Sequence, residues 1–501
     1  MKIAKNQDFT ITYILTKWLP ILLILFFASI LYFYQINRES LWIDEIWSII
    51  YAKKHPFASF NRALYPILLS VWMRFGDNEA WLRSLSVVFG LISIWLIYQL
   101  GMRLADRATG LIAALLLTLS PLVINHAQEV RMYVLSMCLG LGGSLILTFL
   151  LKRPKISLCL WWLSLRIMAV LTTPINILLL LPDALILGWQ FFSQPEKKLI
   201  VLKKWFWLFG ILIIPAVIII KDVVPPLIEF LGVPEFSHQI GIAAFFGAIT
   251  RFTILYLNSP VEQLSWFYEH IFVNLYALVL VILLGVAWFN RKKLTALWWI
   301  AAWGFCPSIA IFALSQFFPT LWGVDRYILF TAPYIFIILA KGFIQVWRWR
   351  KIVAVAIAAI YVIAVSGSLI RHYNLPYRED WRGVAQTITI AGQPNDAIAL
   401  FPEQYLVALD YYYQGANPIF TIEMPPREKY FRPIDKPSLE KMLNELPKFH
   451  ARLWLVFAWA HTSIEDRNNI VPSVLQEHFE LEYFQKFTGI DLFLIEAKST
   501  K

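Results

Sequence analysis

The sequence predicts a polytopic α-helical membrane protein that carries a small α/β domain at its C-terminus. Of its 501 residues, 59% are hydrophobic and 15% are charged, which is too little charge to cover a water-soluble globule of this size. The hydrophobic residues gather in runs long enough to cross a bilayer. After Arg371 charged residues, prolines and tyrosines become common. We therefore expect a transmembrane domain over residues 1–371 and an extracytoplasmic domain over residues 372–501.

Eleven apolar runs, each about 17 to 25 residues long, are candidate membrane spans. They fall near 18–36, 84–100, 108–124, 130–150, 156–172, 174–191, 204–221, 270–289, 294–316, 326–346 and 351–370. With a cytoplasmic N-terminus, every tight basic cluster lies on the cytoplasmic side, as the positive-inside rule requires. The apolar run Ile240–Leu257 contains Arg251, and counting it as a span would invert this bias downstream. We expect that run to be interfacial or re-entrant.

The same bias explains the net charge of +11, because the basic residues stand in short clusters between the apolar runs. We expect membrane lipids around this chain and no nucleic-acid partner. The three cysteines lie inside apolar runs without metal-site spacing, which indicates packing residues.

The tail after residue 371 has the pattern of a small α/β domain. Short β-type runs at Asp396–Phe401, Arg452–Trp459 and Leu492–Ala497 alternate with helical stretches at Glu379–Ala391 and Ser438–Leu446.

The first outer loop contains an adjacent acidic pair, Asp44 and Glu45, in a predicted amphipathic helix. The apolar members of this helix follow i, i+3, i+4, i+7 spacing: Ile43, Ile46, Trp47 and Ile50. Ser40 is the expected N-cap, and the helix dipole would favour ionised carboxylates in the first turn. Such a pair can deprotonate a hydroxyl or hold a divalent cation. The structural alternative is a solvated acidic face, which interfacial helices commonly carry.

A second polar cluster precedes the fourth span, in the segment Asn125–Tyr133. On a helix Glu129 and Tyr133 would share one face, and so would Gln128 and Arg131. A charge such as Arg131 at this depth needs a partner or an anionic substrate. Snorkelling of Arg131 to lipid headgroups, or pairing with Glu129, is the structural alternative.

Two further arginines at outer ends of spans, Arg83 and Arg326, are suited to bind phosphate, because the guanidinium donates paired hydrogen bonds. Lipid headgroups would be an equally good partner for them. Arg166 and Asp183 lie on either side of a tight helical hairpin and should reach similar depth. They indicate a structural ion pair, with proton movement as the alternative.

The order of these motifs resembles a known family. An acidic pair in LWIDE, then RSLSVVFGL, AQEVRMY, DRYILFTAP and finally EDWRGVA is similar to the protein O-mannosyltransferase and aminoarabinose transferase clan, in a bacterial branch. The resemblance covers the whole chain. It implies the GT-C fold with an amphipathic juxtamembrane helix and a polyprenyl-phosphate sugar as donor. The chain departs from the family at Asn61–Ala63, where many members have His-Pro-Pro.

The resemblance also implies roles for residues. Asp44 would be the general base and Glu45 would orient the acceptor or a cation, while Arg83, Glu129, Arg131, Tyr133 and Arg326 would bind the donor and its phosphate. A divalent cation such as Mg²⁺ or Mn²⁺ could be held by Asp44, Glu45 or Glu129.

The predicted function is inverting transfer of a monosaccharide to an acceptor hydroxyl on a lipid, glycan or protein, at the outer face of a bacterial inner membrane. A transporter or flippase of lipid-linked sugars is the alternative, although it would be expected to line its middle with polar residues from several spans.

Overall fold

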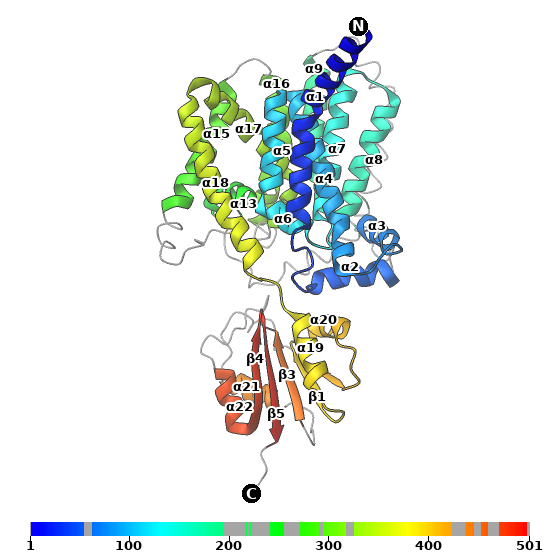
Figure 1. Cartoon of the computed structure of the whole chain (residues 1–501), viewed down its shortest axis with the longest axis vertical. Coiled ribbons are helices and arrows are strands. Elements are labelled where there is room, and N and C mark those ends of the chain that lie inside the picture. Colours follow the sequence, from blue (N-terminus) through cyan, green and yellow to red (C-terminus); the bar gives the residue numbers. More distant parts are fainter. Residues whose placement is uncertain are drawn as a thin grey trace. The chain divides into compact units, whose positions relative to one another are not determined.

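A computed structural model describes residues 2–54, 63–193, 241–254, 271–289, 294–316, 325–422, 436–444, 452–458 and 470–497, together with 217 and 221. It divides into two compact units (Figure 1). The first comprises Met1–Ile36 and Tyr51–Asn374, and the second comprises Asn37–Ile50 and Leu375–Lys501. The predicted division into 1–371 and 372–501 did not anticipate that residues 37–50 group with the C-terminal residues.

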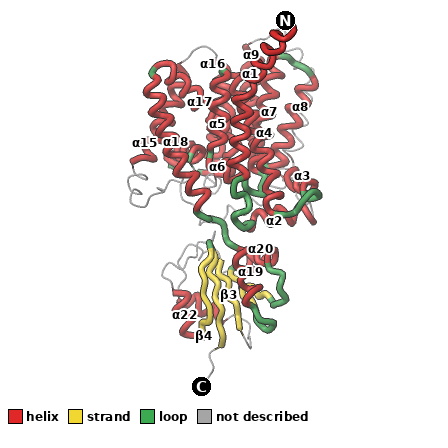
Figure 2. The backbone as a smooth tube through the Cα atoms, viewed as in Figure 1, coloured by secondary structure: helices red, strands yellow, loops and turns green. Residues whose placement is uncertain are grey.

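The first unit is helical, and Figure 2 shows no strand within its described part. Its helices are α1 (Lys2–Phe33), α3 (Leu64–Trp72), α4 (Glu79–Leu104), α5 (Arg107–Leu119), α6 (Pro121–Ala127), α7 (Tyr133–Lys152), α8 (Ile156–Thr172), α9 (Leu180–Ser193), α13 (Ile242–Thr253), α15 (Val273–Val286), α16 (Leu294–Ser315), α17 (Ala332–Trp349) and α18 (Lys351–Asn374). Helix α2 (Ile43–Lys54) begins in the second unit and ends in the first.

Several of these helices match the predicted spans. Five described helices are long and apolar enough to cross a membrane, or six if the bent pair α5–α6 forms one span, and four shorter apolar helices coincide with other predicted spans. The chain is thus a multi-pass membrane protein. The count of eleven is not confirmed, and the predicted span 204–221 lies outside the described residues apart from two positions.

The run 108–124 was predicted as one span, but the helix bends by 63° between Leu119 and Pro121. Pro121 begins α6, and the Ser120 hydroxyl caps it by accepting from the Val123 amide at 3.3 Å. A serine followed by proline is a typical helix start, so this bend follows from local sequence. Helix α13 covers part of the run Ile240–Leu257 with 12 residues, or about 18 Å of helix, which is shorter than the hydrocarbon core.

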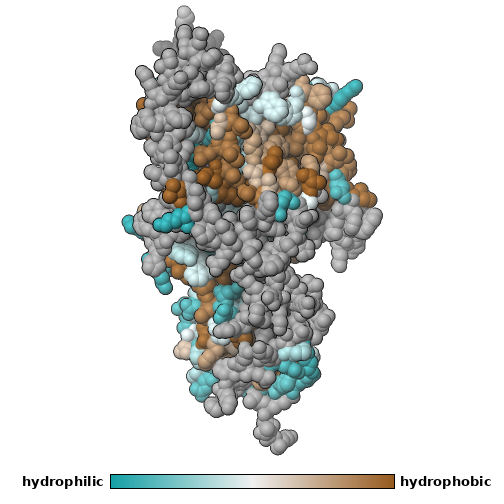
Figure 3. Space-filling model, turned by 180° about the vertical axis from the view of Figure 1, so that it is seen from behind, coloured by the Kyte–Doolittle hydropathy of each residue, from teal (hydrophilic) through white to brown (hydrophobic). Residues whose placement is uncertain are grey.

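The helices pack closely where glycines face each other. A Cβ at Gly110 of α5 would lie 2.6 Å from the Tyr98 carbonyl oxygen of α4. Helix α17 is central: 94% of its most apolar 18-residue stretch is buried. The corresponding stretch of α18 is only 28% buried. The exposed side chains of α18 include Ile352, Val355 and Ile363. Hydrophobic residues cover much of the surface of this unit (Figure 3), as expected for a lipid-facing surface.

The second unit contains a five-stranded sheet in the order β2-β1-β3-β5-β4. Its strands are β1 (Ala397–Phe401), β2 (Ile419–Thr421), β3 (Arg452–Ala458), β4 (Phe479–Phe487) and β5 (Ile490–Ala497), and its helices are α19 (Trp381–Ala391), α20 (Leu406–Tyr412), α21 (Lys436–Asn444) and α22 (Ile470–His478). Strands β2, β1 and β3 are parallel, and β3, β5 and β4 pair antiparallel. The predicted α/β character of the tail is confirmed.

Candidate functional site

The acidic pair lies in the first turn of α2. Trp42 precedes the helix, and the Glu45 carboxylate turns back to accept a hydrogen bond from the Trp42 amide at 3.3 Å. This is the acidic half of a capping box, which satisfies an amide that the helix leaves without a partner. The prediction that Ser40 caps α2 was wrong, since the Ser40 hydroxyl donates to Asp380 at 3.0 Å. A partner 340 residues away in the sequence takes the place of the expected local one.

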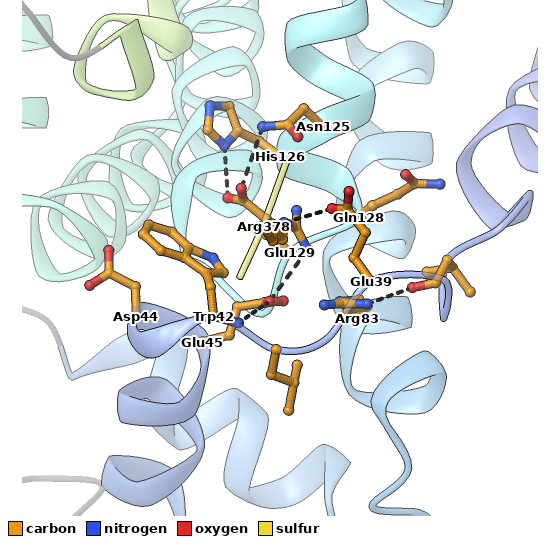
Figure 4. A network of polar contacts seen from close by, with 12 residues as sticks. Glu39, Trp42, Asp44, Glu45, Arg83, Asn125, His126, Gln128, Glu129 and Arg378 are labelled. Atoms are coloured by element: carbon orange, nitrogen blue, oxygen red, sulfur yellow. Dashed lines mark hydrogen bonds and ion pairs between the residues drawn. The ribbon is translucent and has the colours of Figure 1, made fainter. Parts of the chain in front are cut away.

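Glu45 is fully buried, and its partner comes from the far end of the chain. Arg378 Nη1 lies 3.3 Å from the same Glu45 Oε2 that caps α2. Arg378 Nε lies 3.5 Å from Glu39 Oε2, and Glu39 also accepts from the Tyr377 amide at 2.9 Å. Figure 4 shows the guanidinium between these acids. One arginine therefore pairs with two carboxylates of the segment 37–50.

The motif EDWR, which follows Arg378, holds the same loop at further points. The Asp380 carboxylate accepts from Ser40 and from the Gly383 amide, where it caps α19. The Arg382 amide donates to the Ser40 hydroxyl at 3.2 Å. Leu41 adds a third contact, since its amide donates to the Tyr412 hydroxyl at 2.7 Å. The loop 37–42 is thus a part of the second unit.

Asp44 is half-buried, and its side chain points in a different direction from that of Glu45. Its side chain leaves α2 on a side away from the pair of Glu45 and Arg378 (Figure 4). Burial raises the pKa of the Tyr405 hydroxyl, and the carboxylates of Glu379 and Asp44 raise it further. Tyr405 is therefore a protonated neighbour of Asp44 at neutral pH. Two acids that are adjacent in sequence consequently have different surroundings.

The alternative of a solvated acidic face on α2 was wrong for one of its two acids. Glu45 and Ser48 are buried, whereas Trp47 of the apolar stripe is 40% exposed. Long-range partners for Glu45 explain the difference, because a buried carboxylate is tolerated when it is paired and hydrogen-bonded.

In the first unit, Glu129 is buried and bound to residues of α6. Its Oε2 lies 2.8 Å from His126 Nδ1, and its Oε1 accepts from Asn125 at 3.4 Å (Figure 4). Residues 128–132 form a turn between α6 and α7, so the predicted pairing of helix faces does not apply here. His126 of α6 is a direct partner of Glu129.

Gln128 of this turn holds three segments together. Its amide group donates to the carbonyls of Tyr32 and Tyr34 at 3.1 and 2.9 Å. Its oxygen lies 3.0 Å from His372 Nε2. The ends of α1 and α18 thus fix the turn that carries Glu129.

Two arginines meet at the ring of Tyr133. The guanidinium carbon of Arg131 lies 5.5 Å from the ring centroid, and that of Arg326 lies 5.6 Å from it. Arg131 also donates to the Tyr133 hydroxyl at 3.2 Å. The neighbour of Arg326, Asp325, is bound at 2.7 and 2.8 Å by Arg251 of α13. Three residues of the predicted donor set therefore come together, and two like charges at one ring favour an anionic ligand.

Arg83 occupies a different environment. It is 1% exposed, and its Nη1 donates to the Ile36 carbonyl at 2.8 Å. Since Ile36 ends the first unit's N-terminal segment, this contact fixes the chain where it leaves α1.

Arg166 and Asp183 form the predicted buried ion pair at 2.7 Å, with both side chains 1% exposed. Trp162 and Trp303 each donate their indole N–H to the same carboxylate, at 2.8 and 2.7 Å. Arg166 also donates to the Gly140 carbonyl and the Ser144 hydroxyl. This saturated arrangement is typical of a structural ion pair.

A cation site at the acidic residues receives no support from ligand geometry. Within the described ranges, the one group of three side chains with ligand atoms close enough for one ion is Glu440, Glu477 and His478. Lys436 already binds Glu477 there. Asp44, Glu45 and Glu129 do not belong to this group.

Sequence reasoning missed Arg378 and Tyr405. Arg378 stands directly before the motif EDWR, and the motif was the available signal, but only the fold brings it to an acid 333 residues away. The departure at Asn61–Ala63 lies outside the described residues except for Ala63.

Comparison with known proteins agrees with this architecture. Residues 63–221 match the family model described as dolichyl-phosphate-mannose-protein mannosyltransferase. The fold is similar to that of ArnT from Cupriavidus metallidurans in the apo state, with 12% identity, a TM-score of 0.55, and coverage of 96% of this chain and 98% of that one. The archaeal oligosaccharyltransferase AglB from Archaeoglobus fulgidus also matches, with 11% identity, a TM-score of 0.47, and coverage of 96% and 74%. Curated protein sequences show no match.

The segment that matches the family model contains Arg83, Glu129, Arg131 and Tyr133. The likeness to ArnT extends over nearly the whole of both chains. The resemblance predicted from the sequence is therefore confirmed: this chain has the fold of the GT-C membrane glycosyltransferases, and residues 63–221 match the dolichyl-phosphate-mannose-protein mannosyltransferase family.

Proposed function

We propose that this protein transfers a monosaccharide from a polyprenyl-phosphate carrier to an acceptor hydroxyl at the outer face of a bacterial inner membrane. The observation that supports this most is the convergence of Arg131 and Arg326 on Tyr133. Oriented cations at the edge of the spans suit a phosphate that is attached to a membrane-embedded chain.

In this proposal Asp44 is the general base. It accepts the proton of the acceptor hydroxyl while the acceptor oxygen attacks the anomeric carbon. The bond from that carbon to the phosphate oxygen breaks, and the polyprenyl phosphate leaves with one additional negative charge. Arg131 and Arg326 stabilise that charge, as preorganised donors do in a water-poor site. A single displacement inverts the anomeric configuration.

The remaining residues have supporting roles. Tyr133 orients the two arginines, Glu129 sets the turn before α7 through His126, and Arg83 fixes the end of α1. Glu45 holds the start of α2. No step requires a divalent cation, and the dependence on Mg²⁺ or Mn²⁺ is tested by adding a chelator.

The experiment uses the purified full chain in nanodiscs with radiolabelled undecaprenyl phosphate mannose or glucose, tested separately, and membranes of the cognate cell as acceptor. Transfer releases undecaprenyl phosphate and labels the acceptor. Asp44→Asn is expected to abolish transfer but to leave binding of undecaprenyl phosphate intact. Movement of intact donor across the bilayer without cleavage would indicate the flippase alternative, and full transfer by Asp44→Asn would remove the base assignment.

A further inference from the structure

Arg378 and the first turn of α2, which carries Asp44, both belong to the second unit. Arg378 contacts that turn through Glu45. Its side chain is 5% exposed and contacts two acids, Glu39 and Glu45, whose side chains are 14% and 0% exposed. A carboxylate without exposure keeps its charge only if a partner compensates for the lost hydration. For Glu45 the cationic partner observed is Arg378.

The contact falls on the atom that matters for the helix. Glu45 Oε2 accepts from the Trp42 amide and from Arg378 Nη1, each at 3.3 Å. The same oxygen therefore caps α2 and binds the arginine. If Arg378 is lost, Glu45 Oε2 loses this contact, and the hydrogen bond that it accepts from the Trp42 amide is no longer held in place. Asp44 lies within this first turn.

The other anchors of the loop do not involve Arg378. Ser40 is bound to Asp380, and the Leu41 amide is bound to Tyr412. Removing Arg378 should therefore leave the loop attached and disturb mainly the first turn of α2.

We propose that Arg378 is a positioning residue for Asp44: by holding the carboxylate of Glu45 it fixes the first turn of α2 and so the direction of the neighbouring carboxylate. This inference rests on the function proposed above. It gives the C-terminal residues of the second unit a part in catalysis. The expected effect is large, because a reacting group displaced by about 1 Å can lose roughly 100-fold in rate.

The experiment compares two arginines of the same unit. Arg452 is the matched control: it binds Asp396 at 2.9 Å, with side chains 13% and 1% exposed, and belongs to strand β3. Arg378→Ala and Arg452→Ala thus each remove the cation of a largely buried ion pair. Transfer kinetics with the donor found active, thermal unfolding, and binding of undecaprenyl phosphate are measured for both variants.

For Arg378→Ala we expect kcat to fall by roughly 100-fold, with the donor KM within about twofold of that of the native protein. Added methylguanidine should restore part of the kcat of Arg378→Ala and should not change that of Arg452→Ala. If Arg378→Ala does not fold, Arg378→Lys decides, because lysine keeps the charge but loses the planar fork and should lower kcat by about tenfold.

A kcat that falls in Arg378→Ala and Arg452→Ala alike, in proportion to lost stability, would show a purely structural ion pair. Native kcat in a folded Arg378→Ala or Arg378→Lys would also overturn the inference. The proposed function fails separately: it is lost if the native protein moves intact donor without cleaving it. Normal transfer by Asp44→Asn removes the base assignment and this inference with it, whereas an inactive Asp44→Asn beside an active Arg378→Ala removes only the role of Arg378.

Discussion

Asp183 accepts four hydrogen bonds inside the first unit, and we predict that Asp183→Asn strongly lowers the stability of the protein. Two come from Arg166, at 2.7 and 3.0 Å, and one each from Trp162 and Trp303. Asparagine has nearly the same shape, but its amide nitrogen donates and cannot accept. The substitution therefore places the amide nitrogen of asparagine against N–H donors of Arg166 or the two tryptophans. It also leaves the Arg166 guanidinium, whose side chain is 1% exposed, without its counter-ion.

The expected magnitude follows from the burial of the pair. Breaking a buried ion pair from one side typically costs about 3–5 kcal/mol, which is a large part of the roughly 5–15 kcal/mol that keeps a protein folded. A loss of 1 kcal/mol lowers the melting temperature by about 2–4 °C for chains of 150–250 residues and by less for longer ones, so for these 501 residues we expect a drop of roughly 5 °C. Thermal unfolding in detergent, followed by intrinsic fluorescence and by size-exclusion chromatography, measures this shift.

A double variant separates the structural ion pair from proton movement. Asp183→Leu with Arg166→Met removes both charges and should be less destabilised than either single change, since no uncompensated charge remains. It should also keep most of the transfer activity at temperatures where it is folded. An Asp183→Asn variant that melts like the native protein but is inactive would refute this reasoning and would favour proton movement through Asp183.

Three further predictions concern other parts of the chain. Arg131→Gln and Arg326→Gln should each raise the donor KM by roughly 10- to 100-fold, because a hydrogen bond to a charged group contributes about 1.5–3 kcal/mol; unchanged binding of undecaprenyl phosphate would contradict this. Burial raises the pKa of the Asp396 carboxyl, but the hydrogen bonds that it accepts outweigh burial and place its pKa below the usual value. Its contribution to stability is therefore present above about pH 4 and lost as the pH falls through the lowered pKa, so the melting temperatures of the native protein and Asp396→Asn should differ at pH 7 and approach each other as the pH falls below about 4. Gly110→Ala should cost about 1–3 kcal/mol because the new Cβ would lie 2.6 Å from a carbonyl oxygen of α4, whereas Gly188→Ala, with nothing within 4 Å, should be neutral in the same unfolding assay.

The sequence predicted the elements that depend on local pattern. Strands β1 and β3 and helix α19 lie within about two residues of their predicted bounds, because short apolar runs and helix caps depend on consecutive residues. The bend at Pro121 was missed since the run 108–124 was judged by hydropathy alone, although the pair Ser120 and Pro121 is a helix-start signal.

The candidate site was predictable in its residue types and less so in its partners. The chemistry of a charged residue beside lipid suggested that Arg131 needs an anion, and the structure adds Arg326 at the same ring. The environment of Glu45 could not be read from α2, because helical spacing says which residues share a face but not which face a distant segment covers. Arg378 covers that face, and every predicted span except the first lies between it and Glu45 in the sequence.

The two acids of LWIDE therefore illustrate how one dipeptide can supply two functions. Both lie in the first turn of α2, where the helix dipole favours negative charge equally, so their difference must come from the surroundings. The carboxylate of Glu45 binds the Trp42 amide and the guanidinium of Arg378, so it stabilises the start of α2. Asp44 points to the other side, near Tyr405, and is only half-buried. A general base must reach its substrate, whereas a residue that holds the base in place should not, and the burial of these neighbours divides the tasks in that way.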